Sequence, residues 1–212
     1  MKRFIIAILG SAVLIWMCVL MLRTASAQPM PSAPNNMHEF MGAIKGAVPG
    51  FAKKPVYFNS KRAEENIRYL YNKKGVRLII SLDHCENVRK VVNRINEDFP
   101  GVDLRHICRK VLRSKKHYHR NITLFEEVAN YIGNTRFYIH CRYGAHRAVT
   151  VLTGAWVAKG QGFTFEEAFV RAGGKRRAFR SKGQKQLIGQ AKQYAKDFME
   201  AEQCREVELE NE

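Results

Sequence analysis

The chain has 212 residues, of which 46% are hydrophobic and 26% are charged, and this composition predicts one globular domain while excluding disordered and collagen-like chains. The formal net charge is +17, which favours polyanionic partners such as phosphorylated proteins, phosphate esters, nucleic acids or an anionic membrane surface. A solvated basic surface is the simpler explanation for part of this charge.

The N-terminal segment is predicted to direct export. Lys2 and Arg3 precede an uncharged apolar run over residues 4–22, and residues 25–27 (Ala-Ser-Ala) match a leader cleavage site. The run is longer than the roughly 7–15 apolar residues of a secretory leader and close to the ~20 that span a bilayer. Residues 1–27 are therefore predicted to be a signal peptide or a membrane anchor. The protein is expected to be periplasmic or secreted, or held at the inner membrane by residues 4–22.

The rest of the chain divides into three parts by composition. Residues 28–50 are rich in Pro, Asn, Gly and Met without a clear period, which predicts a linker or an N-terminal arm. Residues 51–200 carry alternating helical and strand-like patterns and are predicted to form the folded domain. Residues 201–212 form a tail rich in glutamate.

The folded domain is predicted to be an α/β protein. Its strand patterns are short apolar runs separated by helical patterns, so we expect a central, mostly parallel sheet of about four to five strands flanked by helices. The predicted strands cover residues 56–58, 76–82, 102–107 and 137–140, and the predicted helices cover 60–74 with Ser60 as N-cap, 86–99, 119–132, a segment from near 146, a short helix capped by Thr164, and a long segment from 181.

A strand–loop–helix pattern surrounds Cys141. The strand ends at His140, residues 141–147 form a tight loop, and a helix begins at its far end. The backbone N–H groups of such a loop and the positive end of the helix dipole converge on one anion. Gly144 permits the curvature, and the planar guanidinium of Arg147 can bind two phosphate oxygens at once. The predicted phosphate-binding residues are Arg142, Tyr143, Gly144, Ala145, His146 and Arg147.

Cys141 is the predicted nucleophile. Amide donors, the helix terminus and the Arg147 guanidinium favour the thiolate, and such surroundings lower a cysteine pKa from ~8.5 to roughly 3.5–7.5. The thiolate would attack phosphorus and form a covalent intermediate, from which water would release phosphate in a second step. The sequence therefore predicts a cysteine-dependent phosphatase, with Cys141 and Arg147 as catalytic residues and with no cofactor or metal.

The pattern His-Cys-x-x-Gly-x-x-Arg at residues 140–147 resembles the signature of the protein tyrosine phosphatase superfamily. Residues 56–170 are similar to bacterial, often exported, dual-specificity-like phosphatases. The resemblance implies a dual-specificity phosphatase-like fold and hydrolysis of phosphomonoesters, with phosphotyrosine proteins as the default substrates. The basic segments 109–120 and 175–180 are expected to flank the pocket, where they would favour multiply charged substrates such as phosphoinositides or inositol polyphosphates.

The sequence departs from this family at residue 148, where members usually carry serine or threonine. The hydroxyl at that position helps the thiolate to leave in the second step, and Ala148 has none. Thr150 is close in sequence but is expected to face elsewhere on the helix. Hydrolysis of the covalent intermediate is therefore expected to be slow.

The usual general acid of the family is also missing. Most members carry an aspartate on a loop before the cysteine, where this chain has residues 109–117 without any acid. Proton donation to the leaving oxygen is typically worth ~10²–10⁴-fold in rate. Asp83, after a predicted strand, and His146, inside the loop, are equally favoured candidates. His106 and His117 are further candidates, for which an exposed side chain on a basic surface is the simpler interpretation.

Three other interpretations fit parts of the sequence. A catalytically weak phosphate-binding protein would explain Ala148 and the missing acid. A nucleic-acid binder would use the basic surface, but no specific nucleic acid is expected, because interleaved aromatic residues and a recognised binding motif are lacking. A metal site would use cysteines and histidines between residues 84 and 119, whose spacings match no zinc motif. An exported protein tolerates disulfides, so Cys85 and Cys108 are instead a candidate bridge.

Overall fold

Five strands form one sheet. The computed structural model describes residues 32–51, 57–111, 118–160, 162–174 and 182–210, which belong to one compact unit. The strand order is β1-β2-β5-β3-β4, and every neighbouring pair is parallel except β1 with β2. The predicted α/β class and the mostly parallel sheet are confirmed. The strands are β1 (His38–Phe40), β2 (Ala43–Ala47), β3 (Leu78–Ser81), β4 (Arg105–Cys108) and β5 (Phe137–Cys141).

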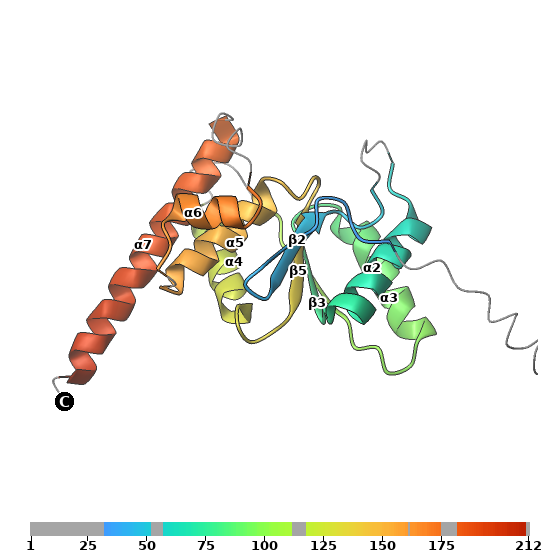
Figure 1. Ribbon diagram of the computed structural model, residues 1–212, viewed down its shortest axis with the longest axis horizontal. Helices are drawn as coiled ribbons and strands as arrows, with labels where there is room; N and C mark the ends of the chain where they lie inside the picture. Colours follow the sequence, from blue (N-terminus) through green and yellow to red (C-terminus); the bar gives the residue numbers. More distant parts are fainter. Residues whose placement is uncertain (1–31, 52–56, 112–117, 161, 175–181, 211–212) are drawn as a thin grey trace, which may run out of the picture. The chain divides into compact units, whose positions relative to one another are not determined.

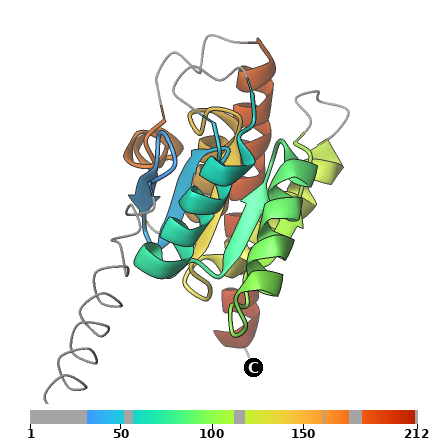
Figure 2. The ribbon, with the colours of Figure 1, turned by 90° about the vertical axis from the view of Figure 1, so that its right-hand side faces the viewer.

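Helices cover both faces of this sheet, which gives the described unit three layers (Figures 1 and 2). One face carries two helices, whose apolar side chains pack on Ile79 and Tyr138. The other face carries four, packed around Ile80 and Ile139. The first pair is α2 (Ser60–Lys74) and α3 (Cys85–Asp98), and the second group is α4 (Tyr118–Tyr131), α5 (Arg147–Ala158), α6 (Phe165–Arg171) and α7 (Lys182–Glu210).

The segment predicted as a linker contains two strands, so that prediction is wrong for residues 38–47. β2 is buried along its whole length and pairs in parallel with β5. Its sequence, Ala-Ile-Lys-Gly-Ala, lacks the β-branched run that marks a buried strand. Small residues are needed there because the ring of Tyr138 crosses the strand: a Cβ on Gly46 would lie 2.1 Å from the Tyr138 hydroxyl oxygen. Packing against β5 therefore overrides the weak strand propensity.

The remaining predicted elements occur within a few residues of their expected bounds, with two corrections. Tyr57 and Phe58 are not in a strand, and Val56 lies outside the described residues. The N-cap of α2 is Asn59 rather than Ser60, because the Asn59 side chain accepts a hydrogen bond from the Arg62 N–H at 2.9 Å. Thr164 caps α6 as predicted and completes a capping box with Glu167.

The predicted leader, residues 1–27, lies outside the described residues. In the part of the chain that the structure describes, no helix has the length and apolar character needed to cross a bilayer.

A disulfide joins Cys85 and Cys108, which confirms the predicted bridge. Cys85 is the first residue of α3, and Cys108 is the last residue of β4. The bond therefore ties the start of a helix to the edge strand of the sheet, and it occupies two of the thiols on which a metal site would depend. Within the described residues, no group of three or more His, Cys, Asp or Glu side chains is arranged to hold a metal ion.

Removing this bridge is expected to lower the stability of the fold. The cysteines are 23 residues apart, and closing a loop of this size in the unfolded chain is worth about 3 kcal/mol in the chain-entropy account. The variant Cys85→Ala/Cys108→Ala should lose about that much free energy of unfolding in urea. Cys204→Ala is the matched control, since Cys204 is free and exposed. A double variant as stable as this control would contradict the expectation.

Candidate active site

Cys141 lies at the end of the central strand. It is the last residue of β5, whose neighbours β2 and β3 both run parallel to it. Its thiol is free, and the residue is only 3% exposed. The carboxyl ends of parallel strands are where ligands of α/β sheets usually bind. The predicted nucleophile therefore stands at the expected edge of the sheet.

The loop after Cys141 turns sharply at Gly144. This glycine has φ +65°, in the left-handed region, and its N–H donates to the Cys141 carbonyl at 3.2 Å. A Cβ on Gly144 would lie 2.1 Å from the carbonyl carbon of Gly46. The loop backbone thus presses directly on β2, and the position excludes any side chain for two independent reasons.

Several N–H groups of the loop have no hydrogen-bond acceptor in the part of the chain that the structure describes. Among the described residues, no backbone or side-chain group accepts a hydrogen bond from the N–H of Arg142, Tyr143 or Ala145. The loop then leads straight into α5, which starts at Arg147 and supplies the positive end of its dipole. Open amide donors beside a helix N-terminus favour an anion. A phosphate-binding loop requires donors of this kind, and the prediction that residues 142–147 bind phosphate remains a hypothesis for experiment.

Arg147 is held in place by two contacts to the segment after β3. One guanidinium nitrogen, Nη1, donates to the Leu82 carbonyl at 3.1 Å, and Nη2 donates to Asp83 Oδ2. The side chain is 17% exposed. The planar group is therefore fixed at the carboxyl edge of the sheet, on the same edge as Cys141.

Asp83 is ion-paired in this arrangement. Partial burial raises the pKa of Asp83, but the hydrogen bond and charge of Arg147, together with His84, more than offset burial and hold the pKa below its ordinary value. Asp83 is thus a carboxylate at neutral pH, and its partner is the predicted phosphate-binding arginine. A group in this state holds an arginine well and donates a proton poorly.

The other loop side chains differ in exposure. Arg142 is exposed, with its guanidinium 5.7 Å from the centre of the Tyr143 ring, which is itself 47% exposed. Ala145 is buried. His146 is half-buried and is the N-cap of α5, but its side chain makes no capping hydrogen bond.

His140 and His106 are joined through Ser81. The Ser81 hydroxyl lies 2.7 Å from His140 Nε2 and 2.8 Å from His106 Nε2. Burial lowers the pKa of His140 to about 3 and, with the charge of Arg89, lowers that of His106 to about 4. Both rings are therefore neutral at pH 7, and His106 is engaged with Ser81 rather than lying on an exposed basic surface. His117 lies outside the described residues.

Ala148 and Thr150 both lie in α5, and neither supplies a hydroxyl at the position that follows Arg147. Ala148 is fully buried in the first turn of α5. The Thr150 hydroxyl donates to the His146 carbonyl at 3.0 Å and accepts from Gln184 Nε2 at 2.6 Å. This hydroxyl is thus committed to contacts on the helix side, as expected, and does not substitute for the missing one.

Two residues that the sequence analysis did not identify donate hydrogen bonds to backbone carbonyls of the loop. Lys45, in β2, donates from Nζ to the Gly144 carbonyl at 3.1 Å. Asn36, before β1, donates from Nδ2 to the Tyr143 carbonyl at 2.8 Å. Both belong to the segment that was predicted as a linker. A lone lysine amid small apolar residues was the only signal in the sequence for such a contact.

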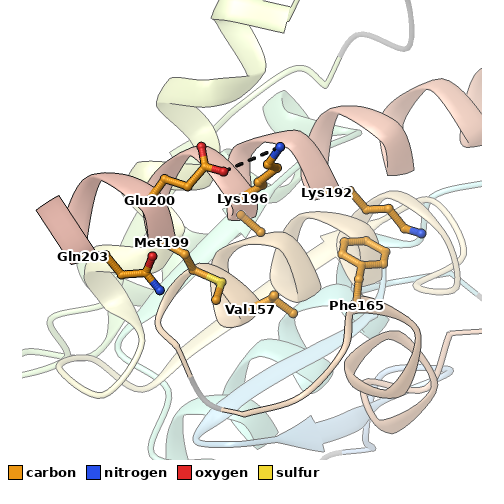
Figure 3. Close-up of a pocket in the computed structure, with 8 residues that line it drawn as sticks. Val157, Phe165, Lys192, Lys196, Met199, Glu200 and Gln203 are labelled. Atoms are coloured by element: carbon orange, nitrogen blue, oxygen red, sulfur yellow. Dashed lines mark ion pairs between the residues drawn. The ribbon is translucent and has the colours of Figure 1, made fainter.

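A pocket of about 320 Å³ lies on the helical layer formed by α5, α6 and α7 (Figure 3). Val157, Phe165 and Met199 supply its apolar wall, and an ion pair between Lys196 and Glu200 lies at its side. None of its lining residues belongs to the loop after Cys141. It is therefore separate from the candidate active site.

No family profile and no curated protein matches this sequence. Solved phosphatase structures do match the fold. The catalytic core of the PP-IP phosphatase SIW14 from S. cerevisiae has a TM-score of 0.50 and 17% identity, covering 85% of this chain and 95% of that one. The Cydia pomonella PTP-2 phosphatase has a TM-score of 0.51 and 17% identity, covering 74% and 88%. Kinase associated phosphatase, with its catalytic cysteine replaced by serine, has a TM-score of 0.50 and 14% identity, covering 74% and 93%. The chain thus has the predicted dual-specificity phosphatase-like fold.

Proposed function

We propose that this protein is a cysteine-dependent phosphatase that hydrolyses phosphomonoesters. The observation that carries the proposal is the buried free thiol of Cys141 at the end of β5, below a loop whose N–H groups include open donors. Arg147 adds a positive charge fixed at the same edge. The fold shared with known phosphatases supports the assignment.

In the first step the Cys141 thiolate attacks phosphorus. A sulfur–phosphorus bond forms, and the bond from phosphorus to the ester oxygen breaks. The non-bridging oxygens are held by loop N–H groups and by the Arg147 guanidinium, which stabilise the charge of the transition state. The leaving oxygen takes a proton from a general acid.

In the second step water attacks the cysteinyl phosphate. The oxygen–phosphorus bond forms as the sulfur–phosphorus bond breaks, and the thiolate is regenerated. The residue that gave its proton in the first step accepts the proton of water. Inorganic phosphate then leaves the loop, and the protonation state of the site returns to its start.

His146 is the proposed general acid, and Asp83 is proposed to position Arg147. The ion pair with Arg147 keeps Asp83 charged, whereas His146 is a half-buried residue of the loop itself, at the N-cap of α5. An imidazole also titrates near neutral pH, which suits both proton donation and the later return of the proton.

Variants at these two positions should therefore differ in kind. His146→Ala should lower kcat/KM for phenyl phosphate, a poor leaving group, by about 10²-fold, with a much smaller loss for p-nitrophenyl phosphate. Asp83→Asn should lower kcat/KM by the same factor for both substrates, because it frees the Arg147 side chain but leaves the proton donor, His146, in place. Steady-state kinetics on the two esters measure this. If Asp83→Asn alone discriminates between them, the two roles are reversed; if neither variant lowers the rate, both are wrong.

Ala148 supports slow turnover of the intermediate. In wild type we expect a burst of released phenol and trapped phosphoenzyme after acid quench, because no hydroxyl assists the departing thiolate. Ala148→Ser should raise kcat several-fold and leave kcat/KM nearly unchanged, since the latter reports steps only through the first irreversible one. A wild-type enzyme without a burst would contradict slow hydrolysis of the intermediate.

A phosphate-binding protein with little turnover is the second candidate, which the buried Ala148 specifically favours. Release of phosphate from an aryl phosphate separates the two functions: the proposed phosphatase turns over many equivalents, and the binding protein stops at one or none. The same assay with phosphotyrosine peptides, phosphoinositides and inositol phosphates would define the substrate class. The net charge of +17 supports a polyanionic substrate at or near an anionic surface. Export, proposed from residues 4–22, is tested by fractionating cells that make the full chain.

A further inference from the structure

We propose that Lys45 and Asn36 are positioning residues that fix the shape of the phosphate loop from behind. The inference rests on the proposed phosphatase function and adds two residues to its machinery, neither of which touches the reacting atoms. Lys45 Nζ donates to the carbonyls of Gly144 and Asn36, at 3.1 and 3.2 Å. Asn36 Nδ2 donates in turn to the Tyr143 carbonyl at 2.8 Å. Two consecutive carbonyls of the loop are therefore held by two side chains, and Lys45 also holds the backbone of Asn36.

The direction of these carbonyls decides what the loop can bind. The carbonyl and the N–H of one trans peptide unit point in opposite directions. Holding the Gly144 carbonyl against Lys45 therefore turns the Ala145 N–H away from the lysine. That N–H has no acceptor among the described residues. An anion-binding loop needs N–H groups turned inward, and Lys45 imposes that orientation on the peptide between Gly144 and Ala145. Asn36 acts differently: it holds the Tyr143 carbonyl, and the N–H of that peptide, on Gly144, donates to the Cys141 carbonyl at 3.2 Å, so this contact fixes the turn of the loop.

Lys45 is buried where it contacts the loop. The residue is 4% exposed, and a lysine is seldom buried so completely unless its ammonium group is well bonded. The turn after α6 closes over it: a Cβ on Gly173 would lie 3.0 Å from both Cε and Nζ. Water therefore has little room to replace the lysine at the loop. The parallel register of Lys45 with Ile139 sets the side chain near the loop that β5 feeds.

Lys45→Met and Asn36→Gly test the proposal by different routes. Methionine keeps the length of the buried chain and removes the donor. Glycine suits the φ of +52° at Asn36, so Asn36→Gly removes only the side-chain donor and leaves the backbone unstrained. Lys74→Met is the control, because Lys74 contacts Glu39 at the far side of β1 and has no contact with the loop.

Three measurements follow each variant: kcat/KM for p-nitrophenyl phosphate, the inhibition constant of inorganic phosphate, and the pH dependence of Cys141 alkylation by iodoacetamide. Lys45→Met should lower kcat/KM and weaken phosphate inhibition by roughly tenfold or more, and should move alkylation to higher pH, because misdirected amides stabilise both the anion and the thiolate less. Asn36→Gly should shift all three in the same direction by a smaller factor. Thermal unfolding reports any loss of fold.

The outcomes distinguish a failure of the proposed phosphatase function from a failure of the positioning role alone. Wild-type protein that neither binds phosphate nor hydrolyses aryl phosphates overturns the proposed function and the positioning role together. Active wild-type protein with Lys45→Met and Asn36→Gly equal to Lys74→Met overturns the positioning role alone. If Lys45→Met fails to fold, Asn36→Gly decides: a folded variant with wild-type values overturns the role, and one with weakened phosphate inhibition and shifted alkylation supports it.

Discussion

Cys141→Ser is expected to abolish hydrolysis of aryl phosphates while phosphate binding persists. Serine keeps the size of the side chain, but its hydroxyl does not ionise near neutral pH, so the attacking anion is lost. We expect kcat to fall by roughly 10⁴-fold or more. The loop N–H groups and Arg147 are unchanged. Removing the negative sulfur from the site should leave inorganic phosphate bound as tightly as in wild type or more tightly, as measured by isothermal titration calorimetry.

Cys204→Ala is the matched control for this experiment. It removes the other free thiol of the described residues, which is exposed on α7, and should keep wild-type rates. Residual hydrolysis above about 1% of wild type in Cys141→Ser would assign the nucleophile elsewhere. Loss of phosphate binding together with activity would mean that the thiol supports the loop rather than attacking the substrate.

Arg147→Lys is expected to lower kcat/KM by about 10²–10³-fold, the cost of losing one preorganised donor at a developing charge. Lysine keeps the positive charge but offers no planar fork. It also cannot reproduce both contacts that hold the guanidinium, to the Leu82 carbonyl and to Asp83. The loss should therefore be shared between a higher KM and a lower kcat, measured on p-nitrophenyl phosphate.

Arg136→Lys is the control for this substitution. Arg136 precedes β5 at the opposite end from Cys141, and its guanidinium pairs with Glu39 on the surface. An exposed pair of this kind is worth at most about 1 kcal/mol, so the control should keep wild-type kinetics. Equal activity of Arg147→Lys and Arg136→Lys would show that a positive charge at residue 147 is sufficient for activity and that the planar guanidinium group is not required.

The loop and its helix were predictable from the sequence because each structural or chemical requirement at that position calls for one particular type of residue. The proposed nucleophile has to be a residue such as Cys141, the left-handed turn against a neighbouring backbone needs Gly144, and the proposed bidentate phosphate contact needs an arginine such as Arg147. The residues of the loop are close together in the sequence, so their pattern can be recognised without knowing the fold. The disulfide was only a candidate, because one sequence does not fix which cysteines pair, and the structure shows that Cys85 and Cys108 are joined.

What the sequence could not reveal depends on contacts between distant segments. β2 is a strand because β5 lies beside it and Tyr138 packs across it, and no periodicity in Ala-Ile-Lys-Gly-Ala reports that. The pairing of Asp83 with Arg147 joins residues 64 positions apart. It changed the interpretation of Asp83 from a candidate acid to a positioning group, because the pKa of a carboxyl depends on its neighbours in space.

The strand beside the nucleophile has a practical consequence for how short the protein can be made. A chain trimmed to begin at residue 51 would lack β1 and β2, and β5 would become the outer strand of the sheet. Its unpaired peptide groups would then be open to other molecules along the stretch that ends in Cys141, which invites edge-to-edge association. A shortened chain that keeps this edge of β5 covered must therefore retain β1 and β2, which begin at His38.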